Sequence, residues 1–204
     1  MSQISEERRQ RKHDRQKQLL LAAAGRLFAE QGYNSVTVRR IAEEADCSQG
    51  TLYTYFADKA DILKHLCEET FTRLGKLLDE VEAKKLKPKA SLVDASRVFA
   101  AFCLENPHHF KVFLMASTDF GDEKAVEFVG RMGMESFHRL RRIYEAAEFP
   151  VEKPMGSFAW WNGLKGVVDF VNLHRDKPWF DGERLVDVCI ETMLHGHREG
   201  TGRR

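Results

Sequence analysis

The sequence predicts an all-α protein with an N-terminal head of three helices and a C-terminal bundle of longer helices. Apolar residues recur at spacings of three and four along nearly the whole chain, and clean alternation with a period of two is absent. Of the 204 residues, 43% are hydrophobic and 31% are charged, which supplies enough apolar surface for a sizeable core. The predicted helices of the head are mostly short and the later ones are long, so we expect two domains, residues 1–60 and residues 61–204.

The first helix is expected from about Arg11 to Gln31, with Gly32 in the position that a helix C-terminus favours. One apolar stripe runs along it: Leu20, Leu21, Ala24, Leu27 and Phe28. Basic residues gather ahead of it in a predicted arm over about residues 1–17: Arg8, Arg9, Arg11, Lys12, Arg15 and Lys17. Such arms often follow the DNA backbone or enter the minor groove. The formal net charge of only +1 means that any basic surface is local.

Two short helices follow, Thr37–Ala45 and Ser48–Tyr55, and they predict a helix-turn-helix. The hydroxyl residue that opens each helix can cap it. The turn between them is Asp46-Cys47, where Asp tolerates the left-handed backbone conformation that such a turn needs.

The second short helix carries uncharged polar residues that suit DNA recognition. Gln49 can pair with an adenine through two hydrogen bonds, and Thr51 can contact a thymine methyl group or a base edge. Gly50 weakens a helix by about 1 kcal/mol, but it lets the backbone approach DNA closely. Tyr53 and Tyr55 can donate hydrogen bonds to phosphates.

A fourth helix is expected to begin after Asp58 and to carry the stripe Ile62, Leu63, Leu66, Phe71, Leu74, Leu78 and Val81. The charged stretch Lys84–Lys89, which contains a proline, is the best candidate for a linker. Five helices are predicted beyond it, near Leu92–Glu105, Pro107–Ala116, Asp122–Ala147, Pro154–Leu173 and Gly182–Arg198.

The four cysteines, Cys47, Cys67, Cys103 and Cys189, lie far apart and form no C-x-x-C pair, which suits a reducing cytosol. The N-terminus lacks an apolar signal region, and no stretch of about 18 apolar residues occurs. We therefore expect a cytoplasmic protein.

The stretch from Thr37 to Lys59 contains Ile-Ala-x-x-Ala and Tyr-x-Tyr-Phe-x-x-Lys, and it resembles the DNA-binding domain of the TetR family of transcriptional regulators. The resemblance covers about Gln16–Glu68, including Ala22–Tyr33 upstream. Asp46-Cys47 departs from the family pattern, which usually has Gly and an aliphatic residue. The resemblance implies an all-helical homodimer, usually a repressor, whose two heads read a palindromic operator and whose C-terminal domain binds a small molecule.

By motif position, the family's DNA contacts fall on eight residues, to which we add the cap residue Ser48. The predicted DNA-binding set is Thr37, Arg39, Ser48, Gln49, Gly50, Thr51, Tyr53, Tyr55 and Lys59. Arg40 adds positive charge beside Arg39, and Phe56 falls on a core position of the family pattern.

Aromatic residues concentrate in the second domain, where a mostly apolar pocket between helices is a common ligand site. The predicted ligand-binding residues are Phe99, Phe102, Cys103, Phe113, Met132, Phe137 and Trp161. We expect a small apolar or aromatic effector, because no cluster of arginines lies on the apolar helix faces. Arg139, Arg141 and Arg142 are expected to face solvent.

The last two helices are the expected dimer interface, as is usual in the family. One predicted stripe comprises Phe158, Trp161, Leu164, Val168 and Val171, and the other Leu185, Val188, Cys189, Thr192 and Met193. Gly163 and Gly166 can allow two helices to approach closely.

Other functions find little support in the sequence. The histidine spacings suit no metal site, and no cofactor motif, nucleophile elbow or phosphate-binding loop occurs, so neither a metal, a cofactor nor an enzyme is expected. Two alternatives remain. In one, the DNA-binding protein is controlled by a protein partner instead of a small molecule. In the other, a helical enzyme or carrier merely retains the head.

Overall fold

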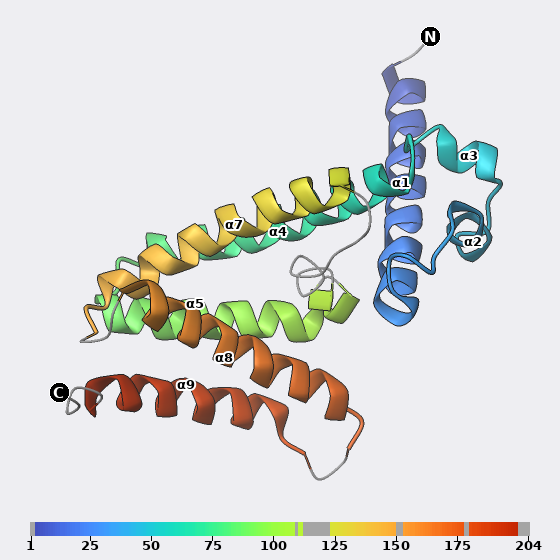
Figure 1. Cartoon of the computed structure of the whole chain (residues 1–204). Helices are drawn as coiled ribbons and strands as arrows, with labels where there is room; N and C mark the ends of the chain where they lie inside the picture. Colours follow the sequence, from blue (N-terminus) through green and yellow to red (C-terminus); the bar gives the residue numbers. More distant parts are fainter. Residues whose placement is uncertain (1–2, 109, 112–122, 150–152, 178–179, 200–204) are drawn as a thin grey trace. The chain divides into compact units, whose positions relative to one another are not determined.

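The computed structural model describes residues 3–108, 110–111, 123–149, 153–177 and 180–199. The helices labelled in Figure 1 are α1 (Gln3–Gln31), α2 (Val38–Glu44), α3 (Gln49–Tyr53), α4 (Lys59–Ala83), α5 (Pro88–Glu105), α7 (Glu123–Ala146), α8 (Lys153–His174) and α9 (Gly182–Glu199). These ranges contain no β-strand, so the all-α prediction is confirmed. None of the helices in them combines the length and the hydropathy needed to cross a membrane.

The chain forms two compact units. The first comprises Met1–Thr70 and His108–Gly133, and the second comprises Phe71–Pro107 and Met134–Arg204. The chain therefore passes from one unit to the other inside α4, between Pro107 and His108, and inside α7. The predicted domain boundary between residues 60 and 61 rests on the change from short to long helices, and it stays a prediction.

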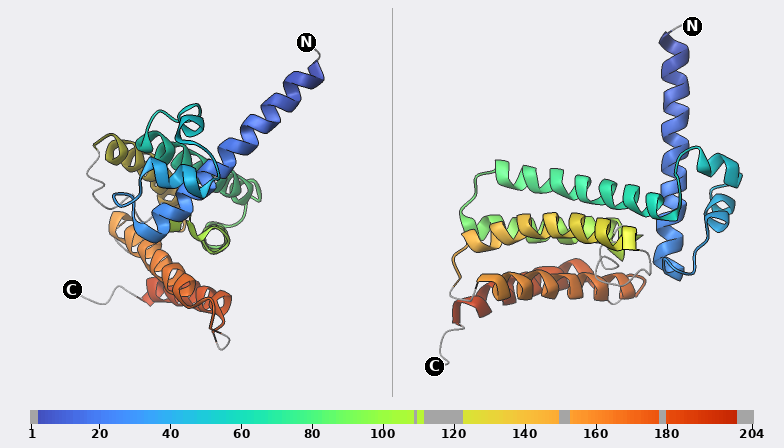
Figure 2. Two further views of the ribbon diagram at one scale, coloured as in Figure 1. Left: turned by 90° about the vertical axis from the view of Figure 1, so that its right-hand side faces the viewer. Right: turned by 45° about the horizontal axis from the view of Figure 1, so that its top comes forward.

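The first helix is longer than its apolar stripe indicates. It begins at Gln3, and Figure 2 shows it as one continuous helix. Side-chain pairs four residues apart support this early part, with Gln10 Nε2 donating to Asp14 at 2.8 Å and Arg11 lying 3.4 Å from Glu7. The prediction of a basic arm ahead of the first helix is wrong, because those basic residues are part of the helix.

Three predicted helix caps in the head are confirmed. The Thr37 hydroxyl accepts a hydrogen bond from the Arg40 amide at 3.2 Å, and the Ser48 hydroxyl accepts one from the Thr51 amide at 3.0 Å. The Asp58 carboxylate accepts one from the Asp61 amide at 2.8 Å. Each cap satisfies an amide that the helix cannot pair internally, which fixes where the helix begins.

The turn between α2 and α3 has the left-handed residue that the sequence predicts. Asp46 has φ +51°, and its amide donates to the Glu43 carbonyl at 3.2 Å. The Cys47 amide donates to the Ala42 carbonyl at 2.9 Å. These two bonds form a Schellman motif, which closes the C-terminus of α2 and turns the chain into α3.

The core of the head joins α1 to the helix-turn-helix. The predicted stripe of α1 is buried, as are Ile41, Leu52 and Phe56. Gly32 ends α1 with φ +78°, a conformation that glycine adopts without strain. The segment between α1 and α2 then returns the chain to the core through Tyr33 and Val36, which are both buried.

Lys59 fastens this returning segment to the start of α4. Its Nζ donates to the carbonyl oxygens of Tyr33 at 2.9 Å and Val36 at 3.0 Å. The same ammonium lies 4.2 Å from the centre of the Tyr33 ring. A partly buried cation thus pairs main-chain carbonyls that no helix or strand would satisfy.

In the second unit, α5, α8 and α9 pack on one another. Trp160 of α8 is fully buried, and its indole Nε1 donates to the Ser96 hydroxyl of α5 at 2.9 Å. Arg97 of α5 donates to Asp187 of α9 at 2.8 Å. Lys84–Lys89 was predicted as a linker, but it is a turn and the first residues of α5 within this unit, with Pro88 as the first helical residue.

Two sequence predictions for this unit are wrong. Arg139 does not face solvent, because its guanidinium packs on α4 and donates to the Asp79 and Glu82 carboxylates. Only Phe158 of the predicted α8 dimer stripe is exposed. The other four members lie in the core of the protomer: Trp161, Leu164, Val168 and Val171.

We predict that Lys59→Met lowers the free energy of unfolding of the head by about 2 kcal/mol, since it removes charge-assisted hydrogen bonds to two buried carbonyls. Urea denaturation followed by circular dichroism measures this. The control is Lys76→Met, which changes an exposed lysine of α4 and should alter stability by less than about 0.5 kcal/mol. Equal effects of the two substitutions would contradict the assigned role of Lys59.

We predict opposite effects for two substitutions at Asp46. Glycine should raise stability by about 0.5 kcal/mol, because it adopts the left-handed conformation without strain, whereas alanine should lower it. Thermal unfolding of the two variants measures the difference. If both variants shift in the same direction, backbone conformation does not govern this position.

Candidate nucleic-acid interface

Helix α3 presents polar residues to solvent and anchors itself by one apolar residue. Leu52 is fully buried, whereas Gln49 and Gly50 are exposed and Tyr53 retains 55% of its accessible surface. An added Cβ at Gly50 would meet only the Ser48 hydroxyl, at 3.6 Å, which is ordinary contact. Packing within the protein therefore does not require this glycine, and its bare backbone is available to a partner.

The hydroxyl groups at the start of α3 are partly engaged within the helix. Ser48 Oγ lies 2.9 Å from Thr51 Oγ1, and it also caps the helix. Thr54 Oγ1 donates to the Thr51 carbonyl at 2.6 Å. These bonds orient Thr51 and leave its methyl group free of polar partners. Gln49 has no hydrogen bond among the described residues, so its amide can make two bonds to a base.

Tyr55 is held by the first helix. Its ring stacks on His13 at a centroid distance of 4.6 Å, with 34° between the ring planes. Lys17 lies 5.8 Å from the ring centre of Phe56, next in sequence. No pattern in the sequence indicates His13 as a partner, because only the packing of α1 brings together two residues that lie 42 positions apart.

The arginines of α2 have acidic partners on the same helix. Arg39 Nε donates to Glu43 at 2.8 Å, and Arg40 donates to Glu44 at 3.2 Å. The hydrogen bond with Glu43 raises the pKa of Arg39 and lowers that of the Glu43 carboxyl. Exposed pairs of this kind contribute little to stability, so phosphate can replace the carboxylate as the partner of Arg39.

Thr37 and Lys59, two further members of the predicted DNA-binding set, have structural partners. Thr37 caps α2, and Lys59 directs its ammonium toward the Tyr33 and Val36 carbonyls. Their contact with DNA stays a prediction. The predicted set nevertheless lies on α2, α3 and the start of α4 or directly beside them, with Thr37 and Ser48 as caps and Tyr55 two residues after α3.

Four predicted ligand-binding residues lie together in the second unit. Phe99, Phe102 and Cys103 are buried on α5, and Phe99 meets Trp161 of α8 edge to face at 5.7 Å. Burial also raises the pKa of the Cys103 thiol, which is therefore uncharged near neutral pH. Phe137 lies elsewhere on α7 and stacks on Phe158 at 4.6 Å. Phe113 and the side chain of Met132 lie outside the described residues.

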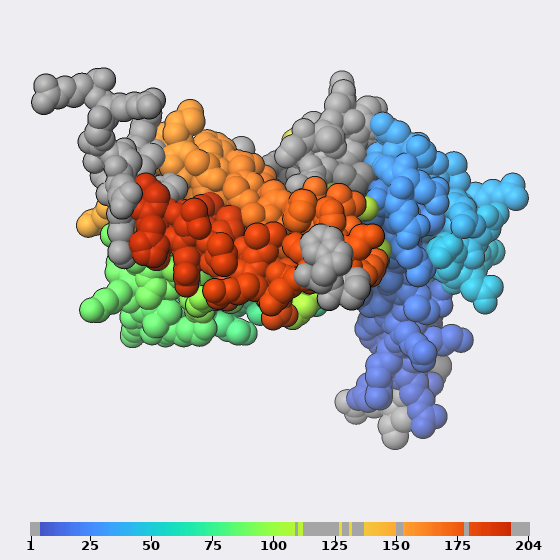
Figure 3. Space-filling view, turned by 90° about the horizontal axis from the view of Figure 1, so that it is seen from below, coloured from blue at the N-terminus to red at the C-terminus, as the bar shows by residue number. Residues whose placement is uncertain are grey.

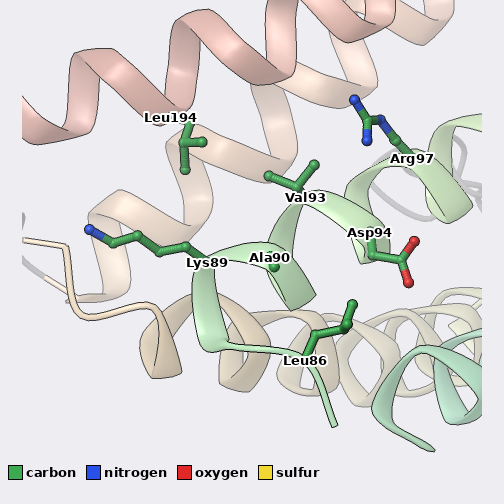
Figure 4. A pocket seen from close by; sticks show the side chains of 7 residues that line it. All are labelled: Leu86, Lys89, Ala90, Val93, Asp94, Arg97 and Leu194. Carbon is green, nitrogen blue, oxygen red and sulfur yellow. The ribbon is translucent and has the colours of Figure 1, made fainter. Parts of the chain in front are cut away.

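A surface groove of about 330 Å³ lies between α5 and α9, and Figure 4 shows the side chains around it. None of the predicted ligand-binding residues lines this groove. Its lining comprises Leu86, Lys89, Ala90, Val93, Asp94, Arg97 and Leu194. Asp94 and Arg97 are already paired, with Lys84 at 2.7 Å and with Asp187 at 2.8 Å. In the described ranges, no three His, Cys, Asp or Glu side chains gather closely enough to hold a metal ion.

Residues 20–66 match the family model of bacterial regulatory proteins, tetR family. The chain is 44% identical over 63 residues to the HTH-type transcriptional regulator HbdR of Aromatoleum sp. (strain CIB). That stretch is 31% of this chain and 24% of HbdR, so the chain matches about a quarter of this relative's length.

The fold is shared over most of the chain. A TetR-like transcriptional regulator from Rhodococcus sp. RHA1 has a TM-score of 0.73 and 18% identity, covering 89% of this chain and 94% of that one. The transcriptional regulator FadR from Bacillus subtilis, solved in complex with stearoyl-CoA, has a TM-score of 0.71 and 18% identity, covering 88% and 98%.

The family to which these proteins belong is one of regulators and not of enzymes. The matched segment contains the capped helix-turn-helix and its exposed polar helix, and the shared fold extends over the rest of the chain. Residues 20–66 of this chain therefore carry the segment that defines bacterial regulatory proteins of the tetR family, and the chain as a whole shares the fold of solved TetR-like regulators.

Proposed function

We propose that this protein is a sequence-specific DNA-binding transcriptional regulator and that α3 reads an operator in the major groove. The observation that carries this proposal is the exposed face of α3, whose Gln49, Gly50 and Tyr53 contribute nothing to the core of the head. A surface helix without a partner would gain nothing from glycine at its second position.

In this proposal, base contacts and phosphate contacts come from different parts of the head. Gln49 pairs with an adenine, and Thr51 contacts a thymine methyl group. Tyr53, Tyr55 and Arg39 bind phosphates, which position the protein without reading sequence.

The early part of α1 is the natural site for additional phosphate contacts. Arg8, Arg11, Lys12 and Arg15 are exposed and follow the spacing of one helix face. Glu7 borders this face and pairs with Arg11 at 3.4 Å, but an exposed pair of this kind is weak enough for phosphate to replace the carboxylate. These contacts would strengthen binding to any sequence and make it dependent on salt.

We propose that the regulator acts as a homodimer on a palindromic operator. Figure 3 shows α8 and α9 side by side on one face of the second unit. Apolar residues remain exposed on these helices: Met155, Phe158, Phe170, Leu173 and Val188. Gly166 lies among them with no atom near the place of a Cβ, so a second helix can approach closely there. In a two-fold symmetric dimer, this face packs against the same face of a second copy of the chain.

The effector is proposed to be a small, largely apolar molecule that releases the protein from DNA as a repressor. The support is the buried aromatic cluster around Phe99 and Trp161, together with the fold shared with FadR, whose solved complex contains stearoyl-CoA. Ligand sites of this kind are mostly apolar with a few polar groups.

Selection of bound fragments from sheared genomic DNA tests the DNA-binding proposal. The purified full chain is mixed with the fragments at about physiological salt, since nonspecific phosphate binding weakens steeply as salt rises. Enrichment of a few fragments with a common palindrome supports the proposal. If no sequence is enriched by protein shown by mass spectrometry to be free of ligand, the proposal is wrong.

We predict that Gln49→Ala weakens binding to the selected operator by about 10- to 100-fold, because one bidentate base contact accounts for about 1–3 kcal/mol of discrimination. Fluorescence anisotropy with operator and scrambled DNA measures this. Binding to scrambled DNA should not change, and Gln18→Ala on the exposed side of α1 should leave both affinities unchanged. An equal loss on both DNAs would assign Gln49 to phosphate binding.

We predict that Leu173→Glu converts the dimer to a monomer, because this side chain keeps 77% of its accessible surface in the protomer and would be buried in the proposed interface. Analytical ultracentrifugation measures the dissociation constant, and circular dichroism checks that the fold is kept. Leu86→Glu is the matched control, since Leu86 is also exposed but lies outside α8 and α9. A Leu173→Glu variant that dimerises as tightly as the control would disprove this interface.

A further inference from the structure

Two adjacent tryptophans of α8 differ in how the structure satisfies their indole N–H groups. Trp160 donates to the Ser96 hydroxyl at 2.9 Å. Trp161 is only 2% exposed, its Nε1 is shielded from solvent, and no acceptor for it occurs among the described residues. Buried donors are nearly always paired in folded proteins, so this N–H is available to an acceptor from outside the described residues.

The same edge of α8 carries two more hydrogen-bonding residues. Lys165 follows Trp161 by one turn, and Asn172 follows Lys165 by two turns, so the three share one side of the helix. Lys165 is half-buried, and burial lowers the pKa of its ammonium group. The amide N and O of Asn172 are shielded and have no partner within the described ranges. We call Trp161, Lys165 and Asn172 the polar edge of α8.

The polar edge begins in aromatic surroundings. The ring of Phe99 from α5 stands edge-on to Trp161 at 5.7 Å. One turn before Trp161, Phe158 stacks on Phe137 of α7 at 4.6 Å. Phe102 and Cys103 are buried on the next turn of α5. A molecule that meets the indole N–H therefore needs an apolar body beside its polar group.

We propose that the effector is an amphiphilic carboxylic acid whose carboxylate is bound by the Trp161 indole N–H and the Lys165 ammonium. A lysine in a helix leans toward the N-terminus, which brings Lys165 toward Trp161. Both groups are donors, and the two oxygens of a carboxylate can accept a hydrogen bond from each of them. The effector's apolar body lies against the aromatic residues around Trp161.

Asn172 lies too far away to bind the same carboxylate. Seven residues of helix separate it from Lys165, which is about 10 Å along the axis. It marks the place where a longer effector carries a second polar group. This inference rests on the proposed function only in taking the second unit as the effector domain.

Calorimetric titration of the full chain tests the proposal with defined probes. The probes are straight-chain carboxylates from hexanoate to octadecanoate, phenylalkanoates, and the alcohol that matches each of them. At least one carboxylate should bind about tenfold or more tightly than its alcohol, because a charge-assisted hydrogen bond is stronger than a neutral one. Lys165→Met keeps most of the aliphatic stem and should abolish this preference. Lys153→Met, at an exposed position of the same helix, should keep it.

NMR of nitrogen-labelled tryptophan separates ligand binding by Trp161 from a merely structural role, because a structural role would leave its indole N–H resonance unchanged when the carboxylate is added. Addition of the bound carboxylate should shift the Trp161 indole N–H resonance downfield, whereas the Trp160 resonance, already paired with Ser96, should move little. Trp161→Phe removes the N–H, identifies the resonance, and should weaken carboxylate binding severalfold with little effect on the alcohol.

Three results would overturn the proposal: no carboxylate binds, the alcohol binds equally well, or Lys165→Met weakens both probes to the same extent. None of these measurements uses DNA. Their failure would leave operator selection by the head untouched, and failure of operator selection would leave the titrations interpretable. The two proposals can therefore fail separately.

Discussion

The Lys59 ammonium and the two carbonyl oxygens that it pairs fix the geometry of the head. The segment between α1 and α2 is irregular, and within it the Val36 amide donates to the Tyr33 carbonyl, at 3.3 Å. Lys59 supplies donors to the Val36 and Tyr33 carbonyls from the first turn of α4, across 23 and 26 residues of sequence. Because that segment leads directly into α2, the position of the helix-turn-helix relative to α1 and α4 depends on this contact. As a consequence, the Lys59 ammonium directs two of its donors toward the protein itself.

Helix α3 depends on that frame, because five residues cannot form a stable helix alone. The Ser48 cap, the Schellman turn at Asp46 and the burial of Leu52 hold it in place. Little of its surface is then needed for packing. A short, well-anchored helix can therefore carry Gln, Gly and Tyr on its outer face, where a longer core helix would need apolar residues. The contacts that hold α3 in place are therefore also the reason why its outer face need not pack against the protein.

The second unit is held together differently, by long helices that bury large aromatic side chains. Most polar atoms there have partners, as Trp160 does with Ser96 and Arg139 with the carboxylates of α4. Against this background, one edge of α8 has two side chains, Trp161 and Asn172, whose shielded polar atoms have no partner among the described residues. The exposed apolar residues of α8 lie on another side of the same helix. Under the two proposals, one helix offers separate sides for the core, an effector and a second protomer.

The sequence by itself determined most of the described helices, the caps in the head and the turn at Asp46, because each of these depends on residues within a few positions of one another. It missed the early part of α1, which has no apolar stripe. It also identified the exposed face of α3, since a helix-turn-helix leaves few ways to orient so short a helix. Only the tertiary structure decided the contacts between distant residues, such as His13 with Tyr55 and Lys59 with Tyr33. It also decided which side of α8 faces the core. That helix has apolar residues on more than one side, and periodicity shows that a stripe exists without showing which neighbour covers it.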